Sequence, residues 1–234
     1  IDFCANLMDI SVLNHNTHIL SVNIEDCENV LSLEPVYSMV NLESLSLSGS
    51  FVDQLEIIGI EELGIQQHLK YLSLDMCDVS DINALSKLTS LETLLLDHTY
   101  YSSMGAPEML SWVSSLTNLK SLKVNSYGAE NLDALSSLSN LETLYVNGTH
   151  TLHNINGLSK LEKLKSLTLD SSNTNPNFVS VAPLKALGQL EYLSVSGFGT
   201  VDELVDFKSQ DTLKSLCLDN YNLSNLSPIL RFTN

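Results

Sequence analysis

A six-residue frame of apolar positions, spaced as L-x-x-L-x-L, recurs along the whole chain and limits the folds that the chain can adopt. Nine copies can be aligned, and they begin at Ile19, Leu42, Leu69, Leu91, Leu119, Leu141, Leu164, Leu190 and Leu213. The intervals between successive copies run from 22 to 28 residues. Self-similarity at a short period is the sequence signature of a protein built by stacking one structural unit many times.

The spacing inside each copy predicts a short strand followed by a helical turn. The two inner apolar positions of a frame, such as Leu72 and Leu74, alternate with polar residues and therefore point to one side of a strand. Apolar residues three apart then follow, for example Val79, Ile82 and Leu85, and they suit a 3₁₀ or short helical turn. One unit cannot enclose its own leucines, so we expect neighbouring units to close the core above and below it.

The ninth position of the frame calls for a small side chain whose polar group satisfies the backbone at the turn. The ninth residue is Cys27 in the first copy and Cys77 in the third. We interpret both as buried residues that repeat at this position from unit to unit, and not as redox groups. Tyr127, Phe198 and Tyr221 depart from the small-residue pattern, and we expect distorted turns there. The four cysteines form no C-x-x-C pair, so no disulfide framework or zinc ribbon is expected.

The charge balance narrows the classes of partner. The 234 residues carry 11 basic and 28 acidic side chains, a net charge of −17, so binding of nucleic acid through its phosphates is not expected. The same charge would attract a basic protein, although acidity that only keeps a repeat protein soluble is an equal alternative. No apolar run approaches the roughly 20 residues of a membrane span, so we expect no membrane insertion.

The complete unit resembles the 22-residue subclass of leucine-rich repeats. Residues 79–91 (VSDINALSKLTSL) resemble the repeats of bacterial internalins and of Sds22, a regulatory subunit of protein phosphatase 1, and residues 221–228 (YNLSNLSP) are similar to an internalin run. The resemblance implies an α/β, mainly β, solenoid: a horseshoe with a parallel concave sheet and a convex side of 3₁₀ or short helical turns. It favours a secreted or cell-surface compartment, with the cytoplasm as the alternative.

We expect a single domain over residues 1–234, with nine full repeats, partial ones at both ends, and no polar cap at either end. At the start, Ile1, Phe3 and Asn6 fit the second half of an earlier frame, so we expect the sequence to begin inside a strand. At the other end, the apolar spacing continues through Leu223, Leu226, Ile229 and Phe232.

Three units are longer than the rest. Their extra residues lie at 51–63, 100–107 and 171–179, and insertions in a solenoid form loops on one face. Tyr100 and Tyr101 lie beside small residues, a composition typical of binding loops, so we include both as candidate contacts. The alternative is that these loops are only spacers.

The strand residues between the buried leucines form the main candidate surface, because neighbouring strands about 4.8 Å apart align them in rows. This face is small, polar and acidic, with tyrosines as anchors and Leu95 as its apolar exception, which we expect near Tyr71 and Tyr145. The candidate partner-binding residues are Tyr71, Asp75, Leu95, Asp97, Lys123, Tyr145, Asp170, Tyr192 and Asp219. The alternative is a solvated face in a solenoid that binds by its edges or loops.

The residue after the first leucine alternates in sign from copy to copy. The series reads Glu43, Lys70, Glu92, Lys120, Glu142, Lys165, Glu191 and Lys214. Stacked repeats would make these residues neighbours, so we expect a ladder of opposite charges, which also disfavours a slip in register.

No motif for enzymatic chemistry or a cofactor is present, so we expect no enzyme activity, no catalytic residues and no cofactor. Zinc at His150 and His153, or a metal at the neighbouring Asp75 and Asp97, is the less favoured interpretation, and no metal is expected. The sequence therefore predicts a module that binds a protein partner of basic or mixed charge on the concave face. The alternatives are an intracellular regulatory or scaffold subunit, or the substrate-recognition part of a larger enzyme.

Overall fold

The computed structural model describes most of the repeat region. The described residues are 1–2, 4, 6–27, 32–49, 55–57, 60–79, 81–99, 110–126, 128–170, 179–197 and 207–219. They belong to two compact units, residues 1–104 and 105–234. The loop candidates Tyr100 and Tyr101, the irregular turns at Tyr127, Phe198 and Tyr221, and most of the three insertions lie outside the described residues.

The first unit contains four parallel strands in the order β1-β2-β4-β6. β3 and β5 form a second, two-stranded parallel sheet, which the sequence pattern does not predict. Along the chain, β3 follows β2 and β5 follows β4. The elements are η1 (Ser11–Leu13), β1 (Ser21–Glu25), α1 (Glu34–Tyr37), β2 (Ser44–Ser48), β3 (Leu55–Ile57), η2 (Ile60–Ile65), β4 (Tyr71–Asp75), β5 (Cys77–Val79), η3 (Ile82–Lys87) and β6 (Thr93–Asp97).

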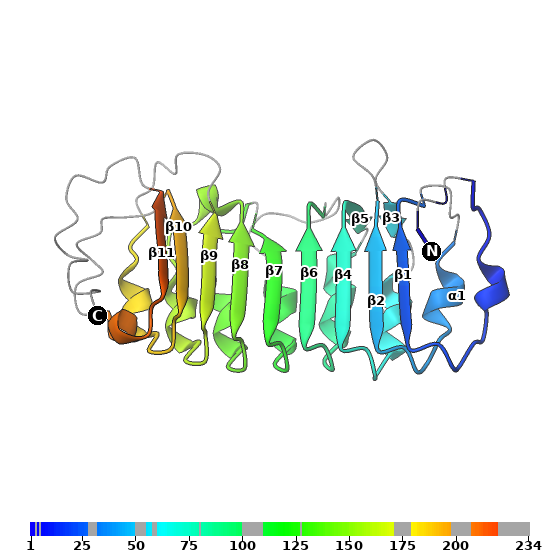
Figure 1. The fold of residues 1–234 in the computed structure, drawn as a ribbon, viewed down its shortest axis with the longest axis horizontal. Helices are drawn as coiled ribbons and strands as arrows, with labels where there is room; N and C mark the ends of the chain where they lie inside the picture. Colours follow the sequence, from blue (N-terminus) through cyan, green and yellow to red (C-terminus); the bar gives the residue numbers. More distant parts are fainter. Residues whose placement is uncertain are drawn as a thin grey trace. The chain divides into compact units, whose positions relative to one another are not determined.

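The second unit repeats the same alternation of strand and 3₁₀ turn. In the part of this unit that the structure describes, five strands are parallel, in the order β7-β8-β9-β10-β11 (Figure 1). The elements are η5 (Ser111–Ser115), β7 (Ser121–Asn125), η6 (Asp133–Ser137), β8 (Thr143–Asn147), η7 (Thr149–Thr151), η8 (Asn156–Lys160), β9 (Ser166–Asp170), η9 (Ala182–Ala186), β10 (Tyr192–Ser196), η11 (Lys208–Asp211) and β11 (Ser215–Asp219).

The frame leucines form the core of each unit, as the spacing predicts. Each of the nine frame strands begins two residues after the first residue of its frame, from Ser21 after Ile19 to Ser215 after Leu213. The second and fourth residues of β4 and β8 have at most 1% of their surface exposed, whereas their neighbours along the strand remain partly exposed. In β11 these positions are only half-buried. Alternation with period two therefore separates the core from an outward face in each unit.

The turns after three strands of the first unit share one backbone conformation. Asp26, Met76 and His98 follow β1, β4 and β6 directly, and all three have positive φ, between 45° and 49°. The amide of Asp26 donates to the carbonyl of Ser48, and that of Met76 to the carbonyl of Asp97. These amides extend the ladder of hydrogen bonds by one step, and those of Gly49 and Ser126 do the same without a positive φ.

The ninth-position residues satisfy backbone carbonyls, which confirms the interpretation of two of the cysteines. Cys27 and Cys77 are buried, and their thiols donate to the carbonyls of Glu25 (3.1 Å) and Asp75 (3.2 Å). Thr99 has the same role with a stronger donor, because its hydroxyl lies 2.6 Å from the carbonyl oxygen of Leu74 and also donates to Asp97.

The N-terminal register differs from the prediction by two residues. The predicted frame puts Asn6 in the ninth position. In the structure Asp2 pairs with Glu25, because the amide of Glu25 donates to the carbonyl of Ile1 and the N-terminal ammonium donates to the carbonyl of Asn23. The shift places Cys4 in the ninth position, where its thiol donates to the carbonyl of Asp2 as Cys27 does to Glu25. The expected continuation through Leu223, Leu226, Ile229 and Phe232 lies outside the described residues. Among the described helices, none has the length and apolarity needed to cross a bilayer.

Candidate functional site

The outward side chains of the strands form one face in each unit. The first-unit face belongs to β1, β2, β4 and β6, and it carries Tyr71, Asp75, Leu95 and Asp97. The second-unit face belongs to β7 through β11, and it carries Lys123, Tyr145, Asp170, Tyr192 and Asp219. All nine predicted contact residues are at least partly exposed, and Tyr192 and Asp219 are the most open. Their participation in binding stays a prediction.

Two carboxylates and a histidine meet on the first-unit face. Asp75 and Asp97 are the last residues of β4 and β6, and they stand directly opposite each other in the parallel register. The Nδ1 atom of His98 lies 3.4 Å from Oδ1 of Asp75 and 3.3 Å from Oδ1 of Asp97. Sequence reasoning had paired the two aspartates but had not placed His98 beside them. The available signal was its position directly after the strand, where the left-handed turn redirects its side chain.

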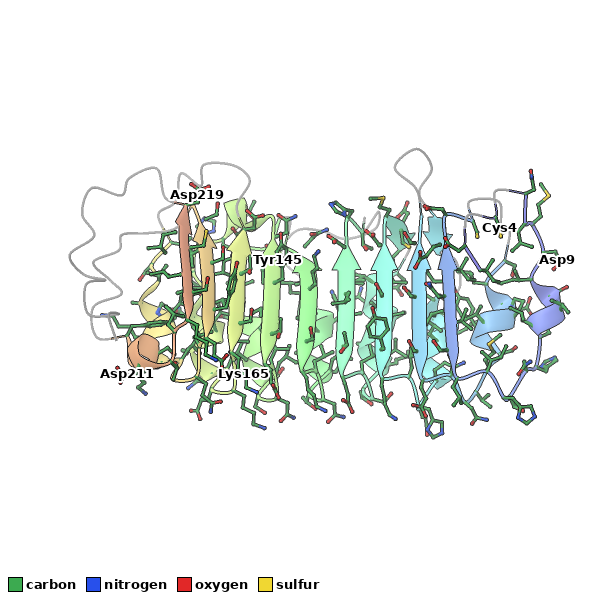
Figure 2. All side chains as sticks on the ribbon, viewed as in Figure 1. Cys4, Asp9, Tyr145, Lys165, Asp211 and Asp219 are labelled. Carbon is green, nitrogen blue, oxygen red and sulfur yellow. The ribbon has the colours of Figure 1, made fainter. Side chains whose placement is uncertain are left out.

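A tyrosine lies between two charged groups on the second-unit face. Tyr145 and Lys123 are register partners on β8 and β7, and the Lys123 ammonium lies 4.9 Å from the centre of the Tyr145 ring. The Tyr145 hydroxyl donates to Oδ2 of Asp170 on β9, across 3.3 Å. Three strands therefore hold one aromatic ring in place, and Figure 2 shows Tyr145 within the sheet of the second unit.

Tyr192 stands in a different setting on the same face. Its register partners on β9 and β11 are Ser166 and Ser215, which are too small to cover its ring. The tyrosine is 39% exposed, which makes it one of the open apolar side chains in the described part of the molecule. Asp219 lies at the end of β11, opposite Ser196 (Figure 2). The second-unit face thus combines exposed aromatic surface with separated carboxylates.

A ladder of opposite charges runs along the residues that precede the strands, as the alternating series predicts. The ammonium of Lys70 lies 3.1 Å from Glu43, that of Lys165 lies 2.6 Å from Glu142, and that of Lys214 lies 2.7 Å from Glu191. The hydrogen bond and charge of Lys165 lower the pKa of Glu142, and Glu142 raises the pKa of Lys165. Lys214 lowers the pKa of Glu191 in the same way. Exposed pairs of this kind add little stability, and their alternation disfavours a slip in register.

The buried titratable groups are not set up for nucleophilic chemistry. Burial raises the pKa of the Cys77 thiol to about 12, and burial also raises the pKa of Cys27. Burial, with the charges of Glu62 and Glu61, raises the pKa of Tyr37. Only a thiolate is a good nucleophile, so the raised pKa makes each of these thiols less reactive than an ordinary cysteine. The side chain of His150, considered above with His153 as a zinc pair, lies outside the described part.

Comparison with known proteins agrees with this repeat geometry. The sequence family described as "Leucine-rich repeat region" matches residues 18–231. The chain belongs to the leucine-rich-repeat family. The expected leucine-rich-repeat solenoid with 3₁₀ turns is therefore confirmed. A search of curated proteins finds no match.

Solved structures include several leucine-rich-repeat proteins of the same fold. Internalin C2 of Listeria monocytogenes matches with 21% identity and a TM-score of 0.67, over 86% of this chain and 80% of that one. A second internalin of that bacterium, inlF, matches with 20% identity and a TM-score of 0.57, over 92% and 71%. The ectodomain of the plant receptor kinase GASSHO1/SCHENGEN3 from Arabidopsis thaliana matches with 22% identity and a TM-score of 0.55, over 84% and 23%. At such identities the likeness establishes the fold.

Proposed function

We propose that this leucine-rich-repeat chain is a recognition module, not an enzyme, and that it binds a protein partner on the outward faces of its strands. The partner surface is basic or of mixed charge, with lysine or arginine side chains that meet the carboxylates of these faces. The candidate contacts are those of the first-unit face and the second-unit face.

The observation that carries the proposal is the arrangement around Tyr145. Its ring is fixed by Lys123 on one side and by Asp170 on the other, among small serine and threonine side chains. Tyrosine is among the residues that dominate binding energy at protein interfaces. A ring already held in one orientation loses less conformational freedom when a partner covers it, so more of the contact energy remains available for affinity.

Charge supports the same assignment. The net charge is −17, and Asp75, Asp97, Asp170 and Asp219 all lie at the carboxyl ends of strands on the outward faces. Such a field accelerates encounters with a basic surface and weakens as salt is added. The GASSHO1/SCHENGEN3 ectodomain is known in complex with CASPARIAN STRIP INTEGRITY FACTOR 2, so a leucine-rich-repeat chain holds a binding partner in that receptor.

Affinity capture with matched variants tests the proposal. Four baits are compared in parallel: the full chain, Tyr145→Ala, Tyr192→Ala and the control Lys160→Ala. The captured proteins are quantified by mass spectrometry. Lys160 is exposed on η8, away from the strands. We expect at least one protein to be retained by the full chain and the control, and to be depleted by both tyrosine variants and by added salt. If the amounts of the captured proteins were the same for the full chain and for both tyrosine variants, the proposed surface would be wrong.

A further inference from the structure

Asp75, Asp97 and His98 form a compact group of three possible metal ligands. One donor atom from each lies within 4.8 Å of the others, and all three residues belong to the first unit. The His98 side chain is 57% exposed, and the aspartate side chains are 38% and 30% exposed, so an ion can reach the group from solvent. The two aspartates come from adjacent strands in fixed register, and His98 comes from the turn that follows β6.

The distances from the imidazole nitrogen to the two carboxylates are long for direct ion pairs and match those around a shared cation. Nδ1 of His98 lies 3.4 Å from one carboxylate oxygen and 3.3 Å from the other. A charge-assisted hydrogen bond between nitrogen and oxygen is about 2.7–2.9 Å long. Two zinc bonds of about 2.0–2.1 Å at a tetrahedral angle place their ligand atoms about 3.3–3.4 Å apart. The distance from the imidazole nitrogen to each carboxylate oxygen therefore equals the distance between two ligands of one tetrahedral metal ion.

The nitrogen donor, and not the acidic pair, distinguishes this group from other carboxylates of the chain. Asp2 and Glu25 also stand opposite each other, but the residue after Glu25 is Asp26, which offers no nitrogen ligand. On the second-unit face Asp170 stands opposite Asn147, and Asp219 opposite Ser196, so the carboxylates there are separated. Two opposed negative charges repel each other, and a cation held between them removes that repulsion.

The donor set selects the class of ion. Calcium and magnesium take oxygen ligands almost throughout, whereas zinc accepts an imidazole nitrogen together with carboxylate oxygens. Three protein ligands leave the fourth tetrahedral position open to water or to a group from outside. We infer that Asp75, Asp97 and His98 form a binding site for one divalent cation of the zinc class. This inference replaces the sequence-based expectation of no metal, and it does not rest on the proposed function.

Titration calorimetry with zinc chloride on the chelator-treated full chain tests this site. His98→Asn removes the nitrogen ligand but keeps a residue that tolerates positive φ. His15→Asn is the matched control, because His15 is also exposed and has a φ of 59°, and because it is not part of the ligand group. We expect one zinc ion per chain, a loss of affinity of roughly tenfold or more in His98→Asn, and no change in His15→Asn. Circular dichroism confirms that each variant is folded.

Four results would contradict this inference. The first is no saturable zinc binding by the full chain, and the second is equal affinity in the full chain and His98→Asn. The third comes from cobalt substitution: a thiolate-to-cobalt charge-transfer band would place the ion at a cysteine instead. Calcium is titrated in parallel, and calcium binding as tight as zinc binding would also contradict an assignment that depends on the imidazole nitrogen.

Discussion

The hydroxyl of Tyr145 on β8 donates a hydrogen bond to Oδ2 of Asp170 at the end of β9, across 3.3 Å. These residues are not register partners, since Tyr145 pairs with Thr168 and Asp170 pairs with Asn147. The bond therefore runs diagonally and joins two rows of the second-unit face. Together with the Lys123 ammonium over the ring, this bond holds the tyrosine in one orientation, and the fixed ring is central to the proposed binding surface.

The frame leucines are expected to dominate the stability of each unit. Leu144 lies in β8 with 1% of its surface exposed, whereas its neighbour Thr143 is exposed. Leu144→Ala should lower the free energy of unfolding by about 2–5 kcal/mol, since it leaves a cavity between stacked repeats. Thr143→Ala, the control on the same strand, should change it by less than about 0.5 kcal/mol. Urea denaturation followed by circular dichroism measures both, and similar values for the two variants would contradict this packing.

Gly157 marks a close approach between neighbouring 3₁₀ turns. A Cβ atom added there would overlap the carbonyl oxygen of Leu132 and would lie 2.9 Å from the Cα of Asp133. Gly157→Ala should therefore lower the unfolding free energy by about 1–3 kcal/mol. Gly188→Ala is the control, because a Cβ atom there would lie 3.9 Å from the nearest side-chain atom. If thermal melts showed both alanine variants to be equally stable, the spacing of η6 and η8 would be wrong.

The charge ladder should make stability depend on acidity. The pKa of Glu142 in the folded chain is lower than its ordinary value of 4.5, because Lys165 stabilises the carboxylate. The stabilisation is thus fully present above pH 4.5 and is lost as the pH falls through the lowered pKa. Lys165→Met should flatten this part of the profile of melting temperature against pH, and Lys160→Met should not. Identical profiles for the full chain and Lys165→Met would exclude a contribution from the pair.

The ninth-position cysteines should resist chemical modification. Burial raises the pKa of Cys77 to about 12, so very little thiolate forms at pH 8, and the sulfur is also shielded from solvent. Cys217 is exposed and should react with iodoacetamide much faster in the native protein. Peptide mass spectrometry over a time course compares the two sites, and denaturant should abolish the difference. Labelling of native Cys77 at the rate of Cys217 would show that its turn opens readily.

The repeat fold could be predicted closely from the sequence, because burial imposes a regular pattern of leucines. Every frame strand starts two residues after the first residue of its frame, as Ser166 does after Leu164. The N-terminal register could not be fixed in this way. A shift of two residues keeps the same side chains on the same face, so the apolar pattern at Ile1 does not distinguish the two registers.

The candidate site could be predicted only in part. Its rows followed from the register, which placed Asp75 opposite Asp97 and Lys123 opposite Tyr145. The third member of the ligand group, His98, depends on a backbone turn whose left-handed conformation sends the side chain back toward the strands. The pairing of β3 with β5 was also missed, because the three-residue segments are too short to show an alternation.

Hydroxyl-radical footprinting of the chain with a captured partner tests the central claim most directly, because it reports which side chains a partner covers. If the outward faces bind the partner, oxidation of Tyr145 and Tyr192 should fall markedly in the complex. Oxidation of His153, which is exposed and lies outside the strands, should stay unchanged. Protection of His153 with no protection of the two tyrosines would place the partner elsewhere and would contradict the account.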